Sequence, residues 1–368
     1  MKLLVQPEDG IKPILDGLAK AEKRIRILIF RFDRVEIEKA LVQAVERGVT
    51  VEALIAYTNQ GEEKNLRKLE MRLLERGITV MRTNNDLVRY HGKMMIIDDR
   101  TLYIFGYNFT HLDIDLSRSF GIVTKKPGVV REAVRLFEAD AHRKEYTSGN
   151  KDLVVSPVNA RERLIDFVEG ARKSLCLYEM KFSDREFMSL LDKKMSEGVE
   201  VRVLSRAASK ARSIPVRKLA GRLHLRAIMR DGEHAFVGSQ SLRRLELEAR
   251  REIGITFRDS SVVAEMEKIF EKDWKKSEVF IENDALVQAI NIPAKKVAKA
   301  VAKHVAVKPM IEQVLDKVVD QKDASFEPAE VAQAVREAFH EEMESTVKDV
   351  LRELVSAAAG AEVALNKK

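Results

Sequence analysis

The sequence predicts an α/β protein of two duplicated halves, each a mixed sheet flanked by helices, followed by a C-terminal helical appendage. The order helix, apolar strand, helix, apolar strand runs through residues 14–57 and returns at residues 164–205. In both copies a glycine-valine pair, at residues 48–49 or 198–199, marks the change from the second helix to the next strand. Glycine suits the left-handed backbone at a helix end. Because order, lengths and glycines recur, we expect the halves to be related by a pseudo-two-fold axis.

Each copy contributes two expected helices and two expected strands. The strands are short, continuous apolar runs, which is typical of strands buried between helices. Alternating helices and strands predict parallel strands in this part of each half. In the first copy the helices are expected at residues 14–24 and 36–49, and the strands at 25–32 and 50–57. In the second copy the helices are expected at 164–174 and 185–199, and the strands at 175–180 and 200–205.

The two copies differ in length and are separated by a linker. The first copy inserts about one extra helix at residues 63–76, followed by residues 77–80, where the second has a shorter basic stretch at 206–222. Residues 146–158 read as the linker, because serine, glycine, asparagine and proline cluster there. The predicted domains are a first half at 1–150, a second half at 151–279 and a helical region at 280–368.

The helical region has two segments of opposite charge. Residues 294–308 form a lysine-rich amphipathic pattern with valines at helical spacing, and residues 330–353 are acidic. The favoured interpretation is that the two pack together or mediate oligomerisation. The alternative is that the basic segment contacts an anionic membrane surface.

Composition restricts the partners and the cellular location. The formal net charge of +7 favours anionic partners, such as nucleic acid, an acidic membrane surface or phosphorylated small molecules. No run approaches the roughly 20 apolar residues that span a bilayer, and residues 1–10 lack a signal-peptide pattern. The single cysteine, Cys176, allows neither an internal disulfide nor a thiolate zinc cluster. We therefore expect a cytoplasmic protein, with peripheral membrane contact as an extension, and no metal or other cofactor.

Two short motifs at matching places in the copies carry the chemistry. They are His91-Gly-Lys93 and His224-Leu-Arg226. Residues two apart in a strand point to the same face, so each histidine stands beside a cation. The cation can neutralise phosphate oxygens while the imidazole attacks phosphorus or donates a proton. If both pairs meet at one phosphate, one histidine can attack and the other can protonate the leaving oxygen.

This tandem pattern resembles the phospholipase D superfamily, whose motif is His-x-Lys, four residues, Asp, six residues and Gly-Ser-x-Asn. The resemblance covers residues 10–275 and implies a phosphodiesterase that forms a covalent phosphohistidine, usually on the first histidine. Phe105-Gly106 stands in place of Gly-Ser in the first motif. The aligned pairs are His91 with His224, Lys93 with Arg226, Asp98 with Asp231, Gly106 with Ser239, and Asn108 with Ser241.

The second motif departs from the family pattern at two positions. Arg226 replaces lysine, which keeps the charge and allows bidentate phosphate binding. Ser241 replaces asparagine and reduces the hydrogen-bonding capacity. Asp98 and Asp231 count among the candidate catalytic residues by their motif positions, although a structural role at the end of a strand is favoured. Candidates to bind phosphate or fix the lysine are Asn108 and Ser239.

The resemblance also implies a carboxylate that orients a catalytic histidine. Glu252 occupies that place in the second half, and it can reach across to orient His91, leaving His224 as the acid. The matching residue of the first half is Ser119, a poor substitute for a carboxylate. Asp113 or Asp115 could supply the carboxylate that is missing there.

Three functions follow from the resemblance and the charge. The first is phospholipid chemistry, either phospholipase D hydrolysis or phosphatidyl transfer of the cardiolipin synthase type. The second is a nuclease, which the basic run at residues 210–218 favours and the low aromatic content of 6% disfavours. The third is a phosphate-binding scaffold without activity, suggested by Arg226, Ser241 and Ser119.

Overall fold

The computed structural model describes most residues of the two halves. Together the halves form one compact unit. The described residues are 1–57, 63–180, 183–205 and 214–279. The expected helical region at 280–368, including its basic and acidic segments, lies outside them. Within the described part, no helix combines the length and apolar character needed to cross a membrane.

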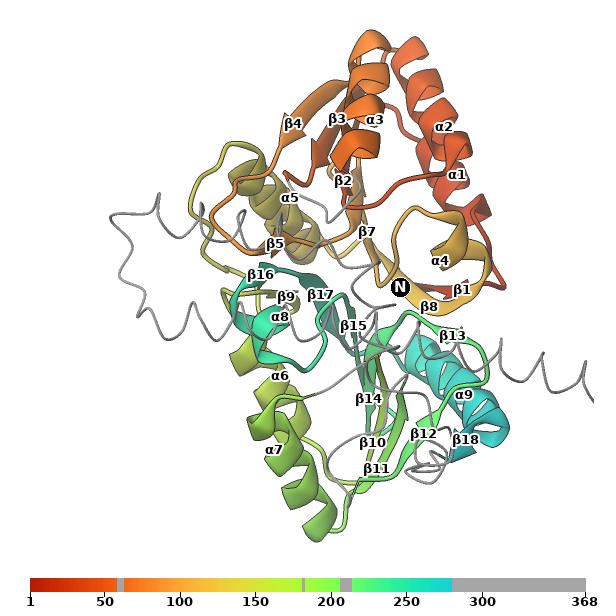
Figure 1. Cartoon of the computed structure of the whole chain (residues 1–368), viewed down its shortest axis with the longest axis vertical. Helices are drawn as coiled ribbons and strands as arrows, with labels where there is room; N and C mark the ends of the chain where they lie inside the picture. Colours follow the sequence, from red (N-terminus) through yellow and green to blue (C-terminus); the bar gives the residue numbers. More distant parts are fainter. Residues whose placement is uncertain (58–62, 181–182, 206–213, 280–368) are drawn as a thin grey trace, which may run out of the picture. The chain divides into compact units, whose positions relative to one another are not determined.

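The first half is a mixed sheet with helices beside it (Figure 1). The strand order is β1-β8-β7-β6-β2-β3-β4, with β2, β3 and β4 parallel and the other neighbours antiparallel. The strands are β1 (Lys2–Gln6), β2 (Arg24–Ile29), β3 (Thr50–Ile55), β4 (Thr79–Arg82), β5 (Arg89–Tyr90), β6 (Met94–Ile97), β7 (Thr101–Phe105) and β8 (Ser117–Thr124). The helices are α1 (Lys12–Ala19), α2 (Val35–Glu46), α3 (Glu63–Glu75), α4 (His111–Asp115) and α5 (Pro127–Ala141).

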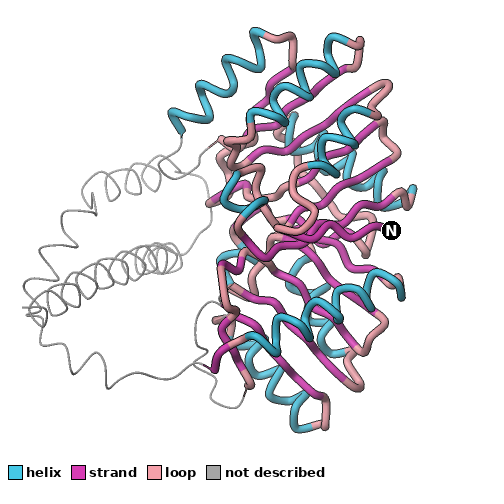
Figure 2. The backbone as a smooth tube through the Cα atoms, turned by 90° about the vertical axis from the view of Figure 1, so that its right-hand side faces the viewer, coloured by secondary structure: helices cyan, strands magenta, loops and turns pink. Residues whose placement is uncertain are grey.

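The second half repeats this plan with the order β18-β12-β11-β10-β14-β15-β17-β9. Its strands are β9 (Leu153–Val155), β10 (Ser174–Glu179), β11 (Glu200–Ser205), β12 (Val216–Lys218), β13 (Arg222–Leu223), β14 (Arg226–Arg230), β15 (His234–Gly238), β16 (Arg250–Arg251), β17 (Ile253–Phe257) and β18 (Glu278–Val279). Its helices are α6 (Ala160–Glu169), α7 (Arg185–Ser196), α8 (Arg244–Glu248) and α9 (Ser260–Lys276). The predicted α/β fold with two duplicated mixed sheets is confirmed for the described residues, and Figure 2 shows the helices flanking the strands.

The first helix of each half ends earlier than the sequence predicts. α1 ends at Ala19 and α6 at Glu169, before the ends expected at residues 24 and 174. In both halves an aspartate carboxylate accepts main-chain N–H groups of the next turn, so these groups are not free to extend the helix. The contacts join Asp98 to residues 22–24 and Asp231 to residues 172–174.

The two halves are joined by an apolar core and by exchanged main-chain pairing. Phe120 of the first half packs edge-on against Tyr178 of the second, with ring centroids 5.6 Å apart. β5 pairs with β16 and β13 pairs with β8, so the two residues before each motif histidine belong to a ladder with the opposite half (Figure 1). This crossed pairing fixes both motifs at the junction of the halves.

Candidate active site

Each motif histidine is anchored through its main chain to the opposite half. The His91 N–H donates to the carbonyl oxygen of Arg251 at 2.7 Å, and the His224 N–H donates to that of Arg118 at 3.1 Å. Both histidines are buried, with 8% and 7% of their surface exposed. The same contact at both motifs gives the site its approximate two-fold symmetry.

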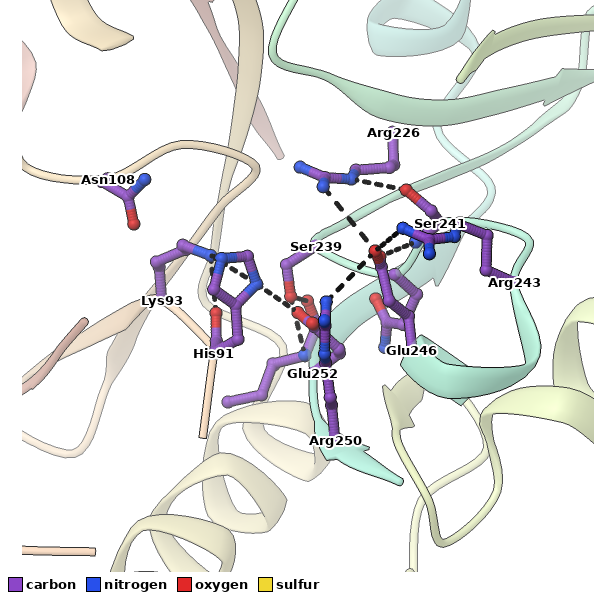
Figure 3. Close-up of polar contacts among 12 residues, drawn as sticks. His91, Lys93, Asn108, Arg226, Ser239, Ser241, Arg243, Glu246, Arg250 and Glu252 are labelled. Carbon is purple, nitrogen blue, oxygen red and sulfur yellow. Dashed lines mark hydrogen bonds and ion pairs between the residues drawn. The ribbon is translucent and has the colours of Figure 1, made fainter. Parts of the chain in front are cut away.

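His91 is held by a carboxylate from the second half. Its Nδ1 lies 2.8 Å from Oε2 of Glu252, which is fully buried (Figure 3). Phe30 packs edge-on against the imidazole, with ring centroids 4.4 Å apart. When Nδ1 carries the proton and donates it to Glu252, Nε2 is unprotonated and keeps its lone pair. The site thus contains a neutral imidazole of fixed orientation.

Lys93 lies against the same imidazole. Its Nζ is 2.9 Å from both ring nitrogens of His91 and 2.6 Å from the His91 carbonyl oxygen. The side chain is fully buried, and its ammonium lies 5.3 Å from the centre of the Phe30 ring. A buried cation beside a neutral histidine is suited to hold a phosphate oxygen close to that histidine.

His224 has a longer and less regular carboxylate contact. Its Nδ1 lies 3.4 Å from Oδ2 of Asp113, which comes from the first half. The other oxygen of Asp113 accepts a hydrogen bond from Arg222 at 2.7 Å. Ser119, at the position that matches Glu252, donates its hydroxyl to the His224 carbonyl oxygen at 2.7 Å. Asp113 is thus the residue beside His224, whereas Asp115 pairs with Arg34 and does not approach the histidine.

Arg226 occupies the place of the second lysine and is held differently. Its Nε donates to the Ser241 hydroxyl at 3.0 Å, and its Nη2 lies 3.9 Å from Oε2 of Glu246. The side chain is 6% exposed, and Nη1 has no hydrogen-bond partner among the described residues. The short Ser241 side chain thus accepts the Nε–H of the larger cation.

The residues at the ends of the motifs support the carboxylates. Asn108 donates both its main-chain N–H and its side-chain amide to Asp113, at 3.0 Å and 2.7 Å. The Ser241 N–H donates to Glu246 at 2.7 Å in the second half. Ser239 is fully buried, and its hydroxyl accepts the N–H of Ile253 at 3.1 Å. These contacts fix the positions of Asp113 and Glu246 next to the two motifs.

Asp98 and Asp231 do not lie at the site, which corrects their inclusion among the catalytic candidates. Both follow the motif strands at the end opposite the histidines and have positive φ angles, 54° and 57°. Their carboxylates are occupied by main-chain N–H groups at distances from 2.6 to 3.3 Å. Burial would raise the pKa of Asp98, but these N–H groups outweigh it and lower the pKa. The structure thus gives both residues the turn-holding role that the sequence favours.

The site contains charged residues that the sequence reasoning missed. Glu246 lies 22 residues after His224, as Asp113 lies 22 residues after His91, so the internal repeat could have revealed it. The other missed residues are partly or fully buried side chains close to Glu246 or Glu252. They are Arg89, Glu179, Arg243 and Arg250.

Burial and charge set the protonation states of the site. Burial lowers the pKa of His91 well below its usual value, and Lys93 and Arg226 act in the same direction. Burial also lowers the pKa of His224, against the opposing effect of Asp113. The environment of both histidines therefore favours the neutral imidazole. Burial likewise lowers the pKa of Lys93 to about 7, although Glu252 opposes this change.

The pKa values of the two carboxylates beside the histidines, Glu252 and Asp113, are shifted in opposite directions. Burial raises the pKa of Glu252, with Lys93 and Arg250 opposing it. Burial also works to raise the pKa of Asp113, but His224, the Asn108 N–H and Arg222 prevail and lower it to about 2. Among the described residues, no group of three or more His, Cys, Asp or Glu side chains is placed to hold a metal ion.

Comparisons with known proteins agree with the resemblance seen in the motifs. Residues 14–141 and 164–274, more than half of the chain, match the family model described as cardiolipin synthase, PLD-like domain. The probable cardiolipin synthase YwiE of Bacillus subtilis (strain 168) is 23% identical over 334 residues. That alignment covers 76% of this chain and 66% of the relative, so the chain spans just under two thirds of the relative's length.

Two solved structures share the fold at low sequence identity. Phosphatidylserine synthase from Haemophilus influenzae Rd KW20 has a TM-score of 0.61 at 13% identity, covering 82% of this chain and 92% of that one. Polyphosphate kinase from Porphyromonas gingivalis has a TM-score of 0.63 at 18% identity, covering 74% and 47%. At these identities the likeness concerns the fold alone.

Proposed function

The chain belongs to the phospholipase D superfamily, and we propose that it hydrolyses or transfers the phosphodiester bonds of phospholipids through a phosphohistidine on His91. The observation that carries this proposal is the contact of 2.8 Å between Glu252 and Nδ1 of His91. It leaves Nε2 of His91 as the nucleophilic atom. The charges of Lys93 and Arg226 act on both histidines, which supports one shared phosphate site.

In the first step, Nε2 of His91 attacks the phosphorus atom and the bond from phosphorus to the leaving oxygen breaks. His224 protonates that oxygen, so the head-group alcohol leaves neutral. Burial, and after it the cations Arg226, Lys93 and Arg222, lower the pKa of His224. The negative charge of a bound phosphodiester opposes this shift and so favours the protonated form. Asp113 stabilises the same form from the other side of the ring.

In the second step, an acceptor attacks the phosphohistidine. His224, now neutral, takes a proton from the acceptor oxygen, which bonds to phosphorus as the bond from phosphorus to Nε2 of His91 breaks. Water as acceptor gives phosphatidic acid, and an alcohol gives a new phospholipid. Throughout, Lys93 and Arg226 stabilise the charge on the phosphate oxygens.

Substrate access requires contact with a lipid surface, and we propose that this contact is peripheral and at an anionic membrane. The net charge of +7 supports attraction to such a surface.

The test is an assay of the full chain, without added metal, on labelled phosphatidylglycerol liposomes and on single- and double-stranded DNA. We expect phosphatidic acid or a transfer product from the liposomes, lost in both His91→Ala and His224→Ala. DNA cleavage with intact lipid would assign the site to a nuclease. Binding of phosphate with no cleavage of either substrate would assign the chain to a phosphate-binding scaffold.

A further inference from the structure

The arginine that binds the His91 main chain also makes an ion pair with the half that contains His91. The Arg251 carbonyl oxygen accepts the His91 N–H, and the Arg251 guanidinium reaches the Asp140 carboxylate in α5. The distances to Oδ1 of Asp140 are 3.2 Å from Nε and 3.1 Å from Nη2. Arg251 of the second half is thus bound to the first half at two points, through its main chain and through its side chain.

The same arrangement recurs around His224 with the halves exchanged. Arg118 of the first half accepts the His224 N–H through its carbonyl oxygen, and its guanidinium pairs with Asp273 in α9 of the second half. Its Nε lies 2.8 Å from Oδ2 of Asp273, and its Nη2 lies 3.4 Å from Oδ1. Asp273 also accepts the Tyr178 hydroxyl at 2.8 Å, and Arg118 also pairs with the half-exposed Glu8.

The two ion pairs occupy matching positions of the internal repeat. In both halves the arginine lies 27 residues, and the aspartate 49 residues, after the motif histidine of that half. Other matching positions differ, since Lys93 corresponds to Arg226 and Ser119 to Glu252. The arginine–aspartate pair is therefore the same in both halves although the surroundings of the two histidines are not. This indicates that the pairs meet a requirement that both histidines share.

Both pairs are buried, which restricts how their side chains can move. The side chains of Arg251 and Asp140 are 7% and 1% exposed, and those of Arg118 and Asp273 are 12% and 8% exposed. The Arg251 guanidinium also lies 5.6 Å from the ring centre of Tyr90, the residue before His91. Separation of a buried pair would leave an uncompensated charge, so both partners resist displacement. Each arginine is therefore held in place together with its carbonyl oxygen.

The residue after each arginine contacts the same histidine again. Glu252 follows Arg251, and its carboxylate lies 2.8 Å from Nδ1 of His91. In the other half, the hydroxyl of Ser119 donates to the carbonyl oxygen of His224 at 2.7 Å. One ion pair thus fixes two contacts of one histidine. A shift of the arginine would move both contacts together, and a misplacement of about 1 Å is enough to slow a reaction strongly.

We infer that two buried aspartates, Asp140 and Asp273, are positioning residues of the site. Asp140 positions His91 and Asp273 positions His224, each through the arginine paired with it. The positioning itself depends on contacts within the chain. The assignment of His91 as nucleophile and His224 as proton donor rests on the proposed function. If both parts hold, the two aspartates support different atoms of the reaction, and their loss has different consequences.

Hydrogen exchange of the histidine main-chain N–H groups tests the positioning without any substrate. The full chain contains 7 histidines, so a sample labelled only on histidine gives few NMR signals. In Asp140→Asn the His91 N–H should exchange about ten-fold faster, with the His224 N–H within about two-fold of its rate in the unmodified chain. Asp273→Asn should show the reverse pattern, with an increase of about five-fold because Glu8 still pairs with Arg118. Equal acceleration of both N–H groups, or unchanged exchange in both variants, would overturn the inference.

The matched controls are Glu138→Gln and Glu271→Gln, which lie two residues before the aspartates in α5 and α9. Glu138 pairs with Arg26 and Glu271 with Arg202, each within its own half. Both controls remove a carboxylate from the same helices and should leave both histidine N–H groups within about two-fold of their original exchange rates. An acceleration as large as in the aspartate variants would mean that the loss of any ion pair from these helices suffices, which contradicts the inference.

Thermal melting shows whether each variant is folded, because removal of one partner of a buried pair can unfold a protein. Arg251→Lys and Arg118→Lys form a second set of variants. Lysine keeps the charge but cannot place two nitrogen atoms on one carboxylate. We expect the same selective pattern, with faster exchange of the His91 N–H in the first variant and of the His224 N–H in the second. Loss of this selectivity in folded lysine variants would also overturn the inference.

A kinetic test assigns each aspartate to one role. The substrates are phosphatidylglycerol, whose leaving alcohol needs a proton, and a phosphodiester with nitrophenol as the leaving group, which needs none. The first turnover is measured, because the second step uses His224 again for both substrates. We expect Asp140→Asn to slow the first turnover about ten-fold on both substrates. Asp273→Asn should slow it about five-fold on phosphatidylglycerol and less than about two-fold on the nitrophenyl substrate.

The two experiments keep the inference and the proposed function distinguishable. Equal losses on both substrates in both aspartate variants would contradict the assignment of one aspartate to each histidine. No turnover of either substrate by the unmodified chain would contradict the proposed function. The exchange rates of the His91 and His224 N–H groups would still decide whether Asp140 and Asp273 position the histidines.

Discussion

The carboxylate of Glu252 lies 2.8 Å from Nδ1 of His91, although 161 residues separate them in the chain. The corresponding contact of the other histidine joins His224 of the second half to Asp113 of the first half, and its length is 3.4 Å. Each half thus supplies the carboxylate for the other half's histidine, and one contact is tighter. The difference favours His91 as the nucleophile and His224 as the proton donor.

We predict that Glu252→Gln lowers kcat about 100-fold or more, whereas Asp113→Asn lowers it about ten-fold. Glutamine keeps the shape of Glu252 but removes the charge that stabilises the phosphohistidine. Steady-state kinetics measure the two effects, and thermal melting shows whether each variant is folded. A larger loss in Asp113→Asn than in Glu252→Gln, at equal melting temperature, would reverse the assigned roles.

Removal of the proton donor should make the covalent intermediate observable. We test His224→Ala with a substrate whose leaving group needs no protonation, so that the first step still proceeds. The second step lacks its base in this variant, and we therefore expect a phosphate adduct to accumulate on His91. The adduct is measured as a mass increase of the intact protein and located by peptide mapping. His91→Ala serves as the control and should form none. An adduct on His224 in the unmodified chain would overturn the assignment.

Lys93 should give substrate binding a pH dependence that arginine removes. Burial lowers the pKa of Lys93 to about 7, with Arg226 acting in the same direction and Glu252, Asp113 and Glu246 opposing. Because the charged form binds phosphate, KM for phosphatidylglycerol should rise about five-fold or more between pH 6.5 and 8. Lys93→Arg remains charged and should show a flat KM. The same rise in both proteins would mean that another group titrates.

Asp98 should contribute to stability without contributing to chemistry. Its carboxylate accepts the N–H groups of residues 22–24, so we expect Asp98→Ala to lower the free energy of unfolding by about 2 kcal/mol. The positive φ of 54° at this position adds to the loss for alanine, whereas Asp98→Asn should lose less. Denaturant titrations measure stability, and kcat per folded molecule should stay within about two-fold. If Asp98→Ala is fully folded but its kcat falls by much more than this, Asp98 has a catalytic role.

This contribution of Asp98 also has a defined dependence on pH. Its pKa in the folded chain is lower than its ordinary value of 3.8. The stabilisation is therefore fully present above pH 3.8 and is lost as the pH falls through the lower, folded value. The difference in stability between the unmodified chain and Asp98→Ala should be constant from pH 6 to 8 and shrink in acid. A difference that shrinks above pH 6 would contradict this account.

The repeat made the fold predictable from the sequence, but not the ends of its helices. Apolar strands and the glycines at 48 and 198 identify the helix–strand units without reference to distant residues. The early ends of α1 and α6 depend on Asp98 and Asp231, which are far along the chain from the turns they bind. Local patterns do not contain such contacts. The domain boundaries near residues 150 and 279 stay predictions.

The candidate site was predictable where the two motifs align and unpredictable where they differ. The motifs locate His91, Lys93, His224 and Arg226, and family resemblance pointed to Glu252. The same alignment could have identified Glu246, which matches Asp113. Arg243 and Arg250 could not be identified in this way, because they replace hydroxyl residues outside the motif, and an arginine in sequence is usually a surface residue. Their position around a buried carboxylate is a property of the folded chain.

The crossed pairing of β5 with β16 also determines when the protein can first act during its synthesis. As the chain leaves the ribosome, the first half emerges with His91 and Lys93 but with neither the Arg251 carbonyl nor the Glu252 carboxylate. His91, the proposed nucleophile, therefore has no orienting carboxylate until the second half is translated and docked. An activity that depends on Glu252 therefore begins only when both halves have been made, and incomplete chains are silent.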